Sequence, residues 1–148
     1  MADHVRKQLR DAVVTALTGL ATTGANAFGA RVYPLQDAEL PALRIFAASE
    51  DALAVSIHTP ALVERTVQLV VEGVAKATSD LDDTLDLISQ EVETALGLGV
   101  VLGSKTIALT YGGCDIELSG EGEKVTGSIS MRFEARLFNT ANAPDVLT

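Results

Sequence analysis

The side chains best suited to chemistry form an acidic run in the middle of the chain, at Asp80, Asp82, Asp83 and Asp86. Asp82 and Asp86 are four residues apart, so on a helix both carboxylates point the same way and could share a divalent cation. The run lacks the central glycine and the distal glutamate of a calcium-binding loop. We interpret it as an acidic helix surface that faces solvent or a partner. A metal-assisted hydrolase that uses the Asp82/Asp86 pair is the alternative.

The residue types that serve as nucleophiles, bases or zinc ligands are few and scattered. His4 lies at the N-terminus and His58 in a predicted loop, and neither has a second histidine or a cysteine at zinc-ligand spacing. Cys114 follows two glycines in a predicted hairpin, which is typical of a small, half-buried residue. No G-x-S-x-G nucleophile elbow occurs. The sequence therefore predicts no catalytic residues, no metal and no cofactor.

A glycine-rich stretch at residues 97–103 is the second feature to test for ligand binding. Leu102 occupies the place of the last glycine in a G-x-G-x-x-G motif, and the stretch follows a predicted helix where that motif follows a strand. Gly103-Ser104-Lys105 also reverses the order of a phosphate-binding Gly-Lys-Ser loop. We predict a plain connection between a helix and a strand.

The last predicted strand carries charges of alternating sign. Arg132, Glu134 and Arg136 alternate with apolar residues, so they share one face of the strand. Such a face is either exposed to solvent or forms a subunit contact in which the charges set the register with a neighbour. Our hypothesis is that Arg132 and Arg136 contact the acidic helix of another copy, at Asp82 and Asp86.

Two amphipathic helices are predicted to position these residues. The first follows Asp3 as N-cap, because apolar residues recur at steps of three and four, at Val5, Leu9, Val13, Ala16, Leu17 and Leu20. The second begins after Ser79 as N-cap and ends at Gly97. Its apolar face is Leu81, Leu85, Ile88, Val92, Ala95 and Leu96.

The remaining segments predict strands joined by loops. Short strands are expected at 31–33 and 43–46, a long strand from Arg65, and a closing hairpin over 107–118 and 125–137 with a turn at 119–123. Gly112-Gly113 indicates a bulge in the hairpin. Residues 48–60 are interpreted as a loop, and loops of that length are often functional. The loop adds Glu50, Asp51 and His58 as candidate contact residues.

This order predicts one domain spanning residues 1–148. The fold class is α+β: a mostly antiparallel sheet, two helices packed on one of its faces, and a long C-terminal hairpin. Residues 139–148 contain Pro144 and no pattern, so we expect a loose tail.

Composition narrows the function classes. With 20 acids against 11 bases the net charge is −9, which repels phosphate backbones and argues against tight DNA binding. The single cysteine excludes a disulfide within the chain. The N-terminus does not have the pattern of a signal peptide, and no apolar run reaches the roughly 20 residues that span a bilayer.

The element order and several short stretches of sequence point to a known family. The residues that carry the likeness are Arg6, Leu9, Arg10, Ala12 and Val13, the connection 37–42, the strand 65–71, Leu81-Asp82, 91–93, Tyr111 and Asp115. In this order they resemble the tail terminator proteins of long-tailed bacteriophages, also called lambda-type minor tail proteins. The resemblance covers about Val5 to Leu137 and rests on element order more than on a signature. The glycine-rich, apolar connection after Gly97 departs from it.

The resemblance implies a structural role in the virion. Proteins of this family form hexameric rings that cap the tail tube at its set length and then offer a surface to the neck or head-completion proteins. DNA passes through the ring, so an acidic chain suits a channel that must not hold it. The implied location is the neck end of the tail, with assembly in the host cytoplasm. Another head–tail joining or tail-completion protein of related fold, and a small binding module, are the alternatives.

The candidate subunit or tube contacts come from the residues themselves, because the resemblance carries no motif that transfers an interface. They are Arg132, Glu134, Arg136, Asp82, Asp86, Glu50, Asp51 and His58.

Overall fold

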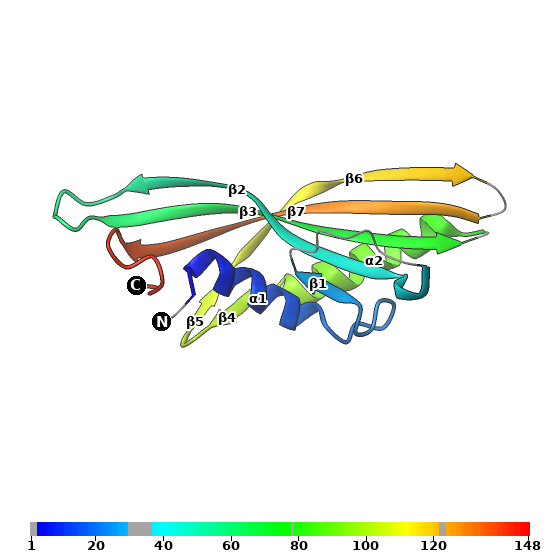
Figure 1. The fold of residues 1–148 in the computed structure, drawn as a ribbon, viewed down its shortest axis with the longest axis horizontal. Helices are drawn as coiled ribbons and strands as arrows, with labels where there is room; N and C mark the ends of the chain where they lie inside the picture. Colours follow the sequence, from blue (N-terminus) through cyan, green and yellow to red (C-terminus); the bar gives the residue numbers. More distant parts are fainter. Residues whose placement is uncertain (1–2, 30–36, 78, 122–123) are drawn as a thin grey trace.

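The computed structural model describes residues 3–29, 37–77, 79–121 and 124–148. In this part of the chain a long, twisted sheet carries both α-helices on one face (Figure 1). The elements in chain order are α1 (Val5–Leu17), β1 (Ala27–Gly29), the 3-10 helix η1 (Asp37–Glu39), β2 (Ala42–Ala54), β3 (Leu62–Ala77), α2 (Leu81–Leu96), β4 (Val100–Leu102), β5 (Lys105–Ile107), β6 (Leu109–Glu121) and β7 (Lys124–Thr140).

The predicted fold class is wrong, because the described chain is mostly β and its main sheet is mixed. The strand order is β1-β2-β3-β7-β6, and β1 runs parallel to β2 while the other neighbours are antiparallel. Strands β4 and β5 form a separate two-stranded sheet. The parallel pair was missed because β1 has only three residues, too few for a periodic pattern. The strand predicted at 31–33 lies outside the described residues.

Helix α1 covers the sheet through residues spaced by four. Val5, Leu9, Val13 and Leu17 are fully buried, which confirms the predicted apolar face, whereas Ala16 is exposed. The N-cap is not the predicted Asp3 but its neighbour, residue 4, whose side chain accepts a hydrogen bond from the helix backbone. The helix ends three residues before the predicted apolar face does, because a glycine turn follows.

Helix α2 packs on β3 and β7 through its predicted apolar face. Leu85, Ile88 and Val92 are buried against the sheet, as expected. The N-cap position is held by Asp80, in a left-handed conformation with a φ of 56° and no side-chain cap, and not by the predicted Ser79. Within the described residues, neither helix has the length and apolar content required to cross a bilayer.

Strand β2 is much longer than predicted, so the interpretation of residues 48–60 as a loop is wrong. It continues to Ala54 and pairs with β3 along its length, with a bulge between Ala47 and Ser49. Only residues 55–61 join the two strands. The polar triplet Ser49-Glu50-Asp51 resembles a loop in isolation, but the ladder to β3 and side-chain partners from other elements hold it extended.

The closing hairpin consists of β6 and β7, but its first strand begins at Leu109 and not at the predicted residue 107, because Ile107 belongs to β5. The predicted bulge is confirmed by the register shift between Tyr111 and Gly113. Pairing runs on to Glu121 and Lys124, so residues 119–121 are strand and not turn. The last residues pack against the rest of the molecule. The Val5 amide donates to the Pro144 carbonyl at 2.8 Å, and the Thr148 amide donates back to β7 at 2.9 Å.

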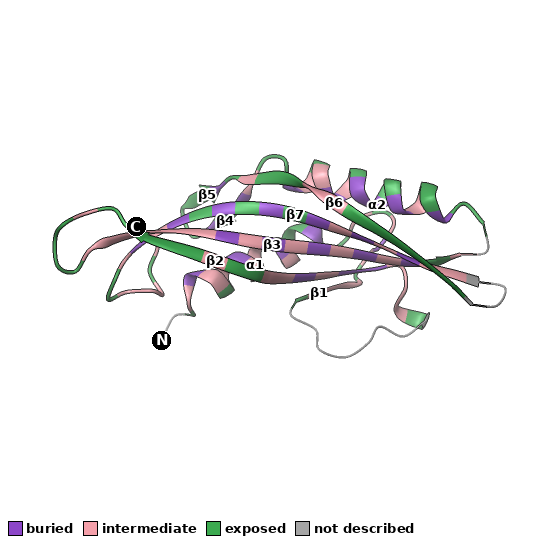
Figure 2. Cartoon of the chain, turned by 90° about the horizontal axis from the view of Figure 1, so that it is seen from above, coloured by how far each residue is buried: buried purple, intermediate pink, exposed green. Residues whose placement is uncertain are grey.

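The core lies between the helices and the inner face of the sheet, where β7 alternates as predicted (Figure 2). Two glycines let α2 approach the sheet closely. A Cβ on Gly73 would lie 2.8 Å from Cγ2 of Ile88, and a Cβ on Gly127 would lie 2.9 Å from Cδ2 of Leu81. Both distances are shorter than a normal carbon–carbon contact, so a methyl group at either position requires the side chains packed on it to shift.

We expect Gly73→Ala to lower the free energy of unfolding by about 1–3 kcal/mol through overpacking against Ile88. Gly120→Ala is the matched control, because Gly120 lies on the exposed strand β6 and a Cβ there meets only Val125, at 3.5 Å. We expect this variant to change the free energy of unfolding by no more than about 0.5 kcal/mol. Urea unfolding of both variants measures the difference. Equal costs would contradict the close approach of α2.

Candidate assembly surfaces

A charged network of Glu50, Arg6 and Arg65 lies where the β2–β3 hairpin extends beyond the helices. Glu50 accepts from Nη1 of Arg6 at 3.1 Å through one carboxylate oxygen and from Nη1 of Arg65 at 2.7 Å through the other. Nε of Arg65 donates to Oδ1 of Asn139 at 2.6 Å. Asn139 is fully buried, and the side chains of Glu50 and Arg65 are each 14% exposed. The network therefore joins α1, β2, β3 and β7.

His4 lies beside this network and caps α1. Its Nδ1 accepts a hydrogen bond from the Arg6 amide at 3.0 Å, which requires that nitrogen to be unprotonated. Burial lowers the pKa of His4, and the positive charges of Arg6 and Arg65 lower it further, while Glu50 acts in the opposite direction. The electrostatic surroundings thus favour the neutral imidazole that the cap needs.

Beyond the network, the hairpin extends past α1 and ends in an apolar tip, which we define as residues 52–63 (Figure 1). Ile57 is 99% exposed and Leu53 65% exposed, and Val55 and His58 are also exposed. The turn is held by its own bonds: the Val55 amide donates to Leu62 at 2.8 Å, and the Leu62 amide donates to Oγ of Ser56 at 2.9 Å. An ordered turn therefore presents apolar side chains to solvent.

The outer face of the sheet, which the helices leave uncovered, is polar. It carries the predicted charges of β7, and each of these has a partner on a neighbouring strand. Arg132 pairs with Asp115 at 2.6 Å, and Arg136 pairs with Glu64 at 3.5 Å. Glu134 accepts from Gln68 at 3.1 Å. These pairs are exposed and contribute little stability, so this face suits water or a polar partner.

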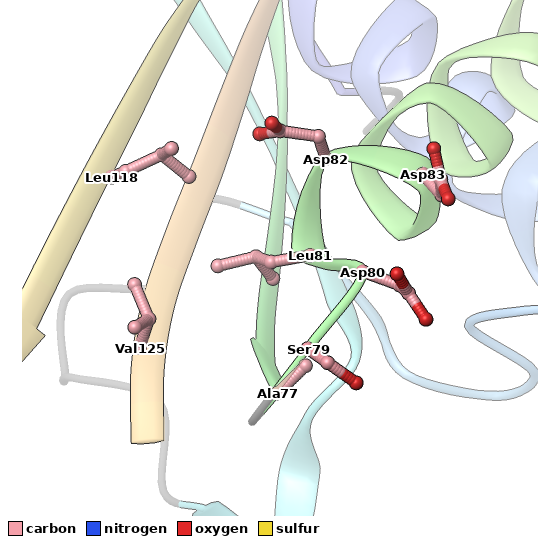
Figure 3. Close-up of a pocket in the computed structure, with 8 residues that line it drawn as sticks. All are labelled: Ala77, Ser79, Asp80, Leu81, Asp82, Asp83, Leu118 and Val125. Carbon is pink, nitrogen blue, oxygen red and sulfur yellow. The ribbon is translucent and has the colours of Figure 1, made fainter. Parts of the chain in front are cut away.

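Acids of α2 gather at its N-terminal end, beside a surface hollow of about 380 Å³ lined by Leu81, Leu118 and Val125 (Figure 3). Figure 3 shows the carboxylates of Asp80, Asp82 and Asp83 pointing in different directions. Among the described residues, no three His, Cys, Asp or Glu side chains are grouped so as to hold a metal ion. The acids instead complement the positive end of the helix dipole.

The single cysteine, Cys114, is half-buried on β6 and lies beside Tyr111. Burial, followed by a hydrogen bond with Cys114, raises the pKa of Tyr111 to about 12. The phenol therefore stays protonated near neutral pH. Its ring packs against Phe133 with centroids 5.4 Å apart. The geometry indicates a packing role for these residues.

The predicted contact residues do not form one site. Asp51 and Arg136 lie in the same row across the outer face, because both pair with Thr66 of β3. Asp82 and Asp86 lie on the helical side of the sheet, and Glu50 is held inside the molecule by its two arginines. His58 is in the exposed tip.

The sequence reading missed the apolar tip and an open groove on α2. The groove has a volume of about 390 Å³ and lies between the turn after α1 and the outward side of α2, where Leu20 and Ala21 face Leu87 and Ala95. Leu87 is 48% exposed. Leu53, Val55 and Ile57 occupy every second position, which is the pattern of a strand, but the polar residues on either side favour a loop. No local sequence pattern can indicate the groove, because its two walls are about 70 residues apart in the sequence.

No family model and no curated protein matches the chain. A chain in the virion of a native gene transfer agent particle has a similar structure, with a TM-score of 0.53 and 23% sequence identity over 92% of both chains. At that identity the likeness shows a shared fold. The match names a virion and not a tail terminator, so the terminator role stays a prediction.

We expect Glu50→Ala to lower the free energy of unfolding by about 2–4 kcal/mol, because two guanidinium groups would lose their counter-charge in a partly buried site. Glu64→Ala is the control: its partner Arg136 is 67% exposed, and we expect a loss of at most about 1 kcal/mol. Chemical unfolding of both variants makes the comparison. A similar cost for both would refute the special role of Glu50.

A second prediction concerns the cap at His4. Because the pKa of His4 is lower in the folded chain than the ordinary value of a histidine, the neutral cap contributes fully above about pH 6.5. The contribution is lost as the pH falls from about 6.5 through the folded pKa. We expect His4→Asn, which keeps an acceptor that does not titrate, to lose less stability than wild type between about pH 7.5 and pH 5. Thermal unfolding across that range tests this, and parallel losses would count against it.

Proposed function

We propose that this protein is a structural component of a virion that forms a ring at the end of a tail tube, stops tube polymerisation and then presents a docking surface to the neck. The observation that carries the proposal is the fold shared with a chain of a gene transfer agent virion over 92% of both chains. The tail terminator resemblance of the sequence supports the more specific role. The proposed partners are further copies of the chain, a tail tube protein and a neck or head-completion protein.

Surface features support a role in assembly. The apolar tip projects from a rigid base, and a projecting apolar element favours a protein contact over a solvated surface. The outer face is polar, and the net charge of −9 suits a ring through which DNA passes without being retained. In this proposal the protein acts through surfaces and not as an enzyme, at the neck end of the tail.

A tail terminator acts once at each tube end, so its effect must scale with the number of tube ends and not with the amount of tube protein. We expect the purified chain, added to growing tubes of the tail tube protein of the same particle, to halt extension at an amount that scales with the number of tube ends. Extra density should appear at one end of each tube in negative-stain images. Tube ends are varied at constant subunit concentration by shearing.

Two outcomes would overturn the proposal. Tubes that extend at an unchanged rate would exclude a terminator. Inhibition that scales with total tube subunit, unaffected by shearing, would indicate that the chain sequesters monomers. Binding to preformed necks with no effect on tubes would instead favour the alternative of a head–tail joining protein.

A further inference from the structure

The exposed side chains of the apolar tip are not covered by other parts of the same copy. A side chain as large as Ile57 at 99% exposure leaves nearly all of its apolar surface in water, which is unfavourable unless another molecule covers it. Among residues 52–63, His58 is the one side chain that can carry charge. The tip is therefore an apolar anchor with a single ionisable group near its end.

The same chain has a groove with matching chemistry. Leu20, Ala21, Leu87 and Ala95 give it apolar walls, and Glu91 is the one ionisable group among the described residues that line it. Both oxygens of Glu91 are oriented by Thr22, whose amide donates at 2.8 Å to one and whose hydroxyl donates to the other. A carboxylate accepts about four hydrogen bonds, so acceptor positions remain for a donor from outside.

The tip cannot reach the groove of its own copy. Figure 1 shows the β2–β3 turn at one end of the long axis, beyond α1. Helix α2 lies under the middle and the opposite half of the sheet, and Figure 2 shows the same separation from above. The hairpin is fixed in that direction at its base by Glu50 and Arg65. A contact between tip and groove must therefore join two copies.

We propose that the apolar tip of one copy inserts into the α2 groove of the next, with Ile57 between Leu87 and Leu20 and with His58 against Glu91. This inference rests on the ring-forming function proposed above and names its subunit contact. Each copy offers one tip and one groove at different places, so the contact is heterologous, and such contacts close into rings when the rotation allows. An imidazole N–H can donate to a carboxylate oxygen, so His58 and Glu91 are complementary as donor and acceptor, and this pair fixes the direction of insertion.

Cross-linking in a cysteine-free background tests this contact. Cys114→Ser removes the one native thiol, and Ile57→Cys and Leu87→Cys then place one thiol on the tip and one in the groove. Under a copper–phenanthroline oxidant, we expect the double variant to give a ladder of covalent oligomers. A mixture of the two single variants should give dimers alone, because each chain then has one thiol.

The matched control replaces the groove position with Leu118→Cys, which keeps Ile57→Cys. Leu118 is 53% exposed, close to the 48% of Leu87, but it lies on β6. We expect at least about tenfold more cross-linking for the Leu87 pair, because docked thiols meet at a high effective concentration. Circular dichroism spectra of all variants should match that of wild type. The experiment is run with the chain alone and with the chain bound to tubes.

The outcomes separate this contact from the proposed function. Equal yields for the Leu87 and Leu118 pairs, or no ladder both in solution and on tubes, would overturn the contact. Cross-linking of the tip to the tube protein would also overturn it, by assigning the tip to a different partner. If the Leu87 ladder forms but the chain does not stop tubes, the contact stands and the terminator role fails. If the chain stops tubes but the Leu87 ladder does not form, the terminator role stands and the contact fails.

Discussion

A carboxylate held between two guanidinium groups allows β2 and β3 to continue past the helical layer. Glu50 faces the inner side of the sheet, where an unpaired charge would be unfavourable, and Arg6 and Arg65 neutralise it there. Arg65 also donates to the side chain of Asn139, which links it to the buried end of β7. The bonds come from four elements, so they fix the direction of the hairpin as well as its register. The position of the apolar tip depends on this arrangement together with the β2–β3 ladder.

The parts of the fold that the sequence predicted are the periodic ones. The steps of three and four in α1 and α2, and the alternation from Ile129 to Leu137, follow from burial on one side and appear in the residues themselves. The errors arise where distant residues decide the structure. Ser49-Glu50-Asp51 favours a loop locally and becomes strand because β3 and Arg6 supply partners. The three residues of β1 carry too little pattern to reveal a parallel pair.

The candidate surfaces show the same division. The charges of β7 were identified as one face from their spacing, but their partners on β3 and β6 could not be known without the register. The sequence predicts His58 as a contact residue in a loop, but it does not distinguish the exposed Ile57 beside it. The groove joins Leu20 to Leu87, which are brought together only by the packing of the α1 turn on α2. Sequence spacing has no means of indicating such a site.

Apolar and charged contacts would contribute differently to assembly. Arg132 and Arg136 already have partners within their own copy, so exchanging these for Asp82 and Asp86 of a neighbour replaces one exposed ion pair with another. That exchange adds little affinity, although it can set orientation. Covering Ile57 removes apolar surface that has no cover within its own chain, so the gain is not offset by a lost contact. The apolar tip is thus better suited than the charged strand to drive the association of copies.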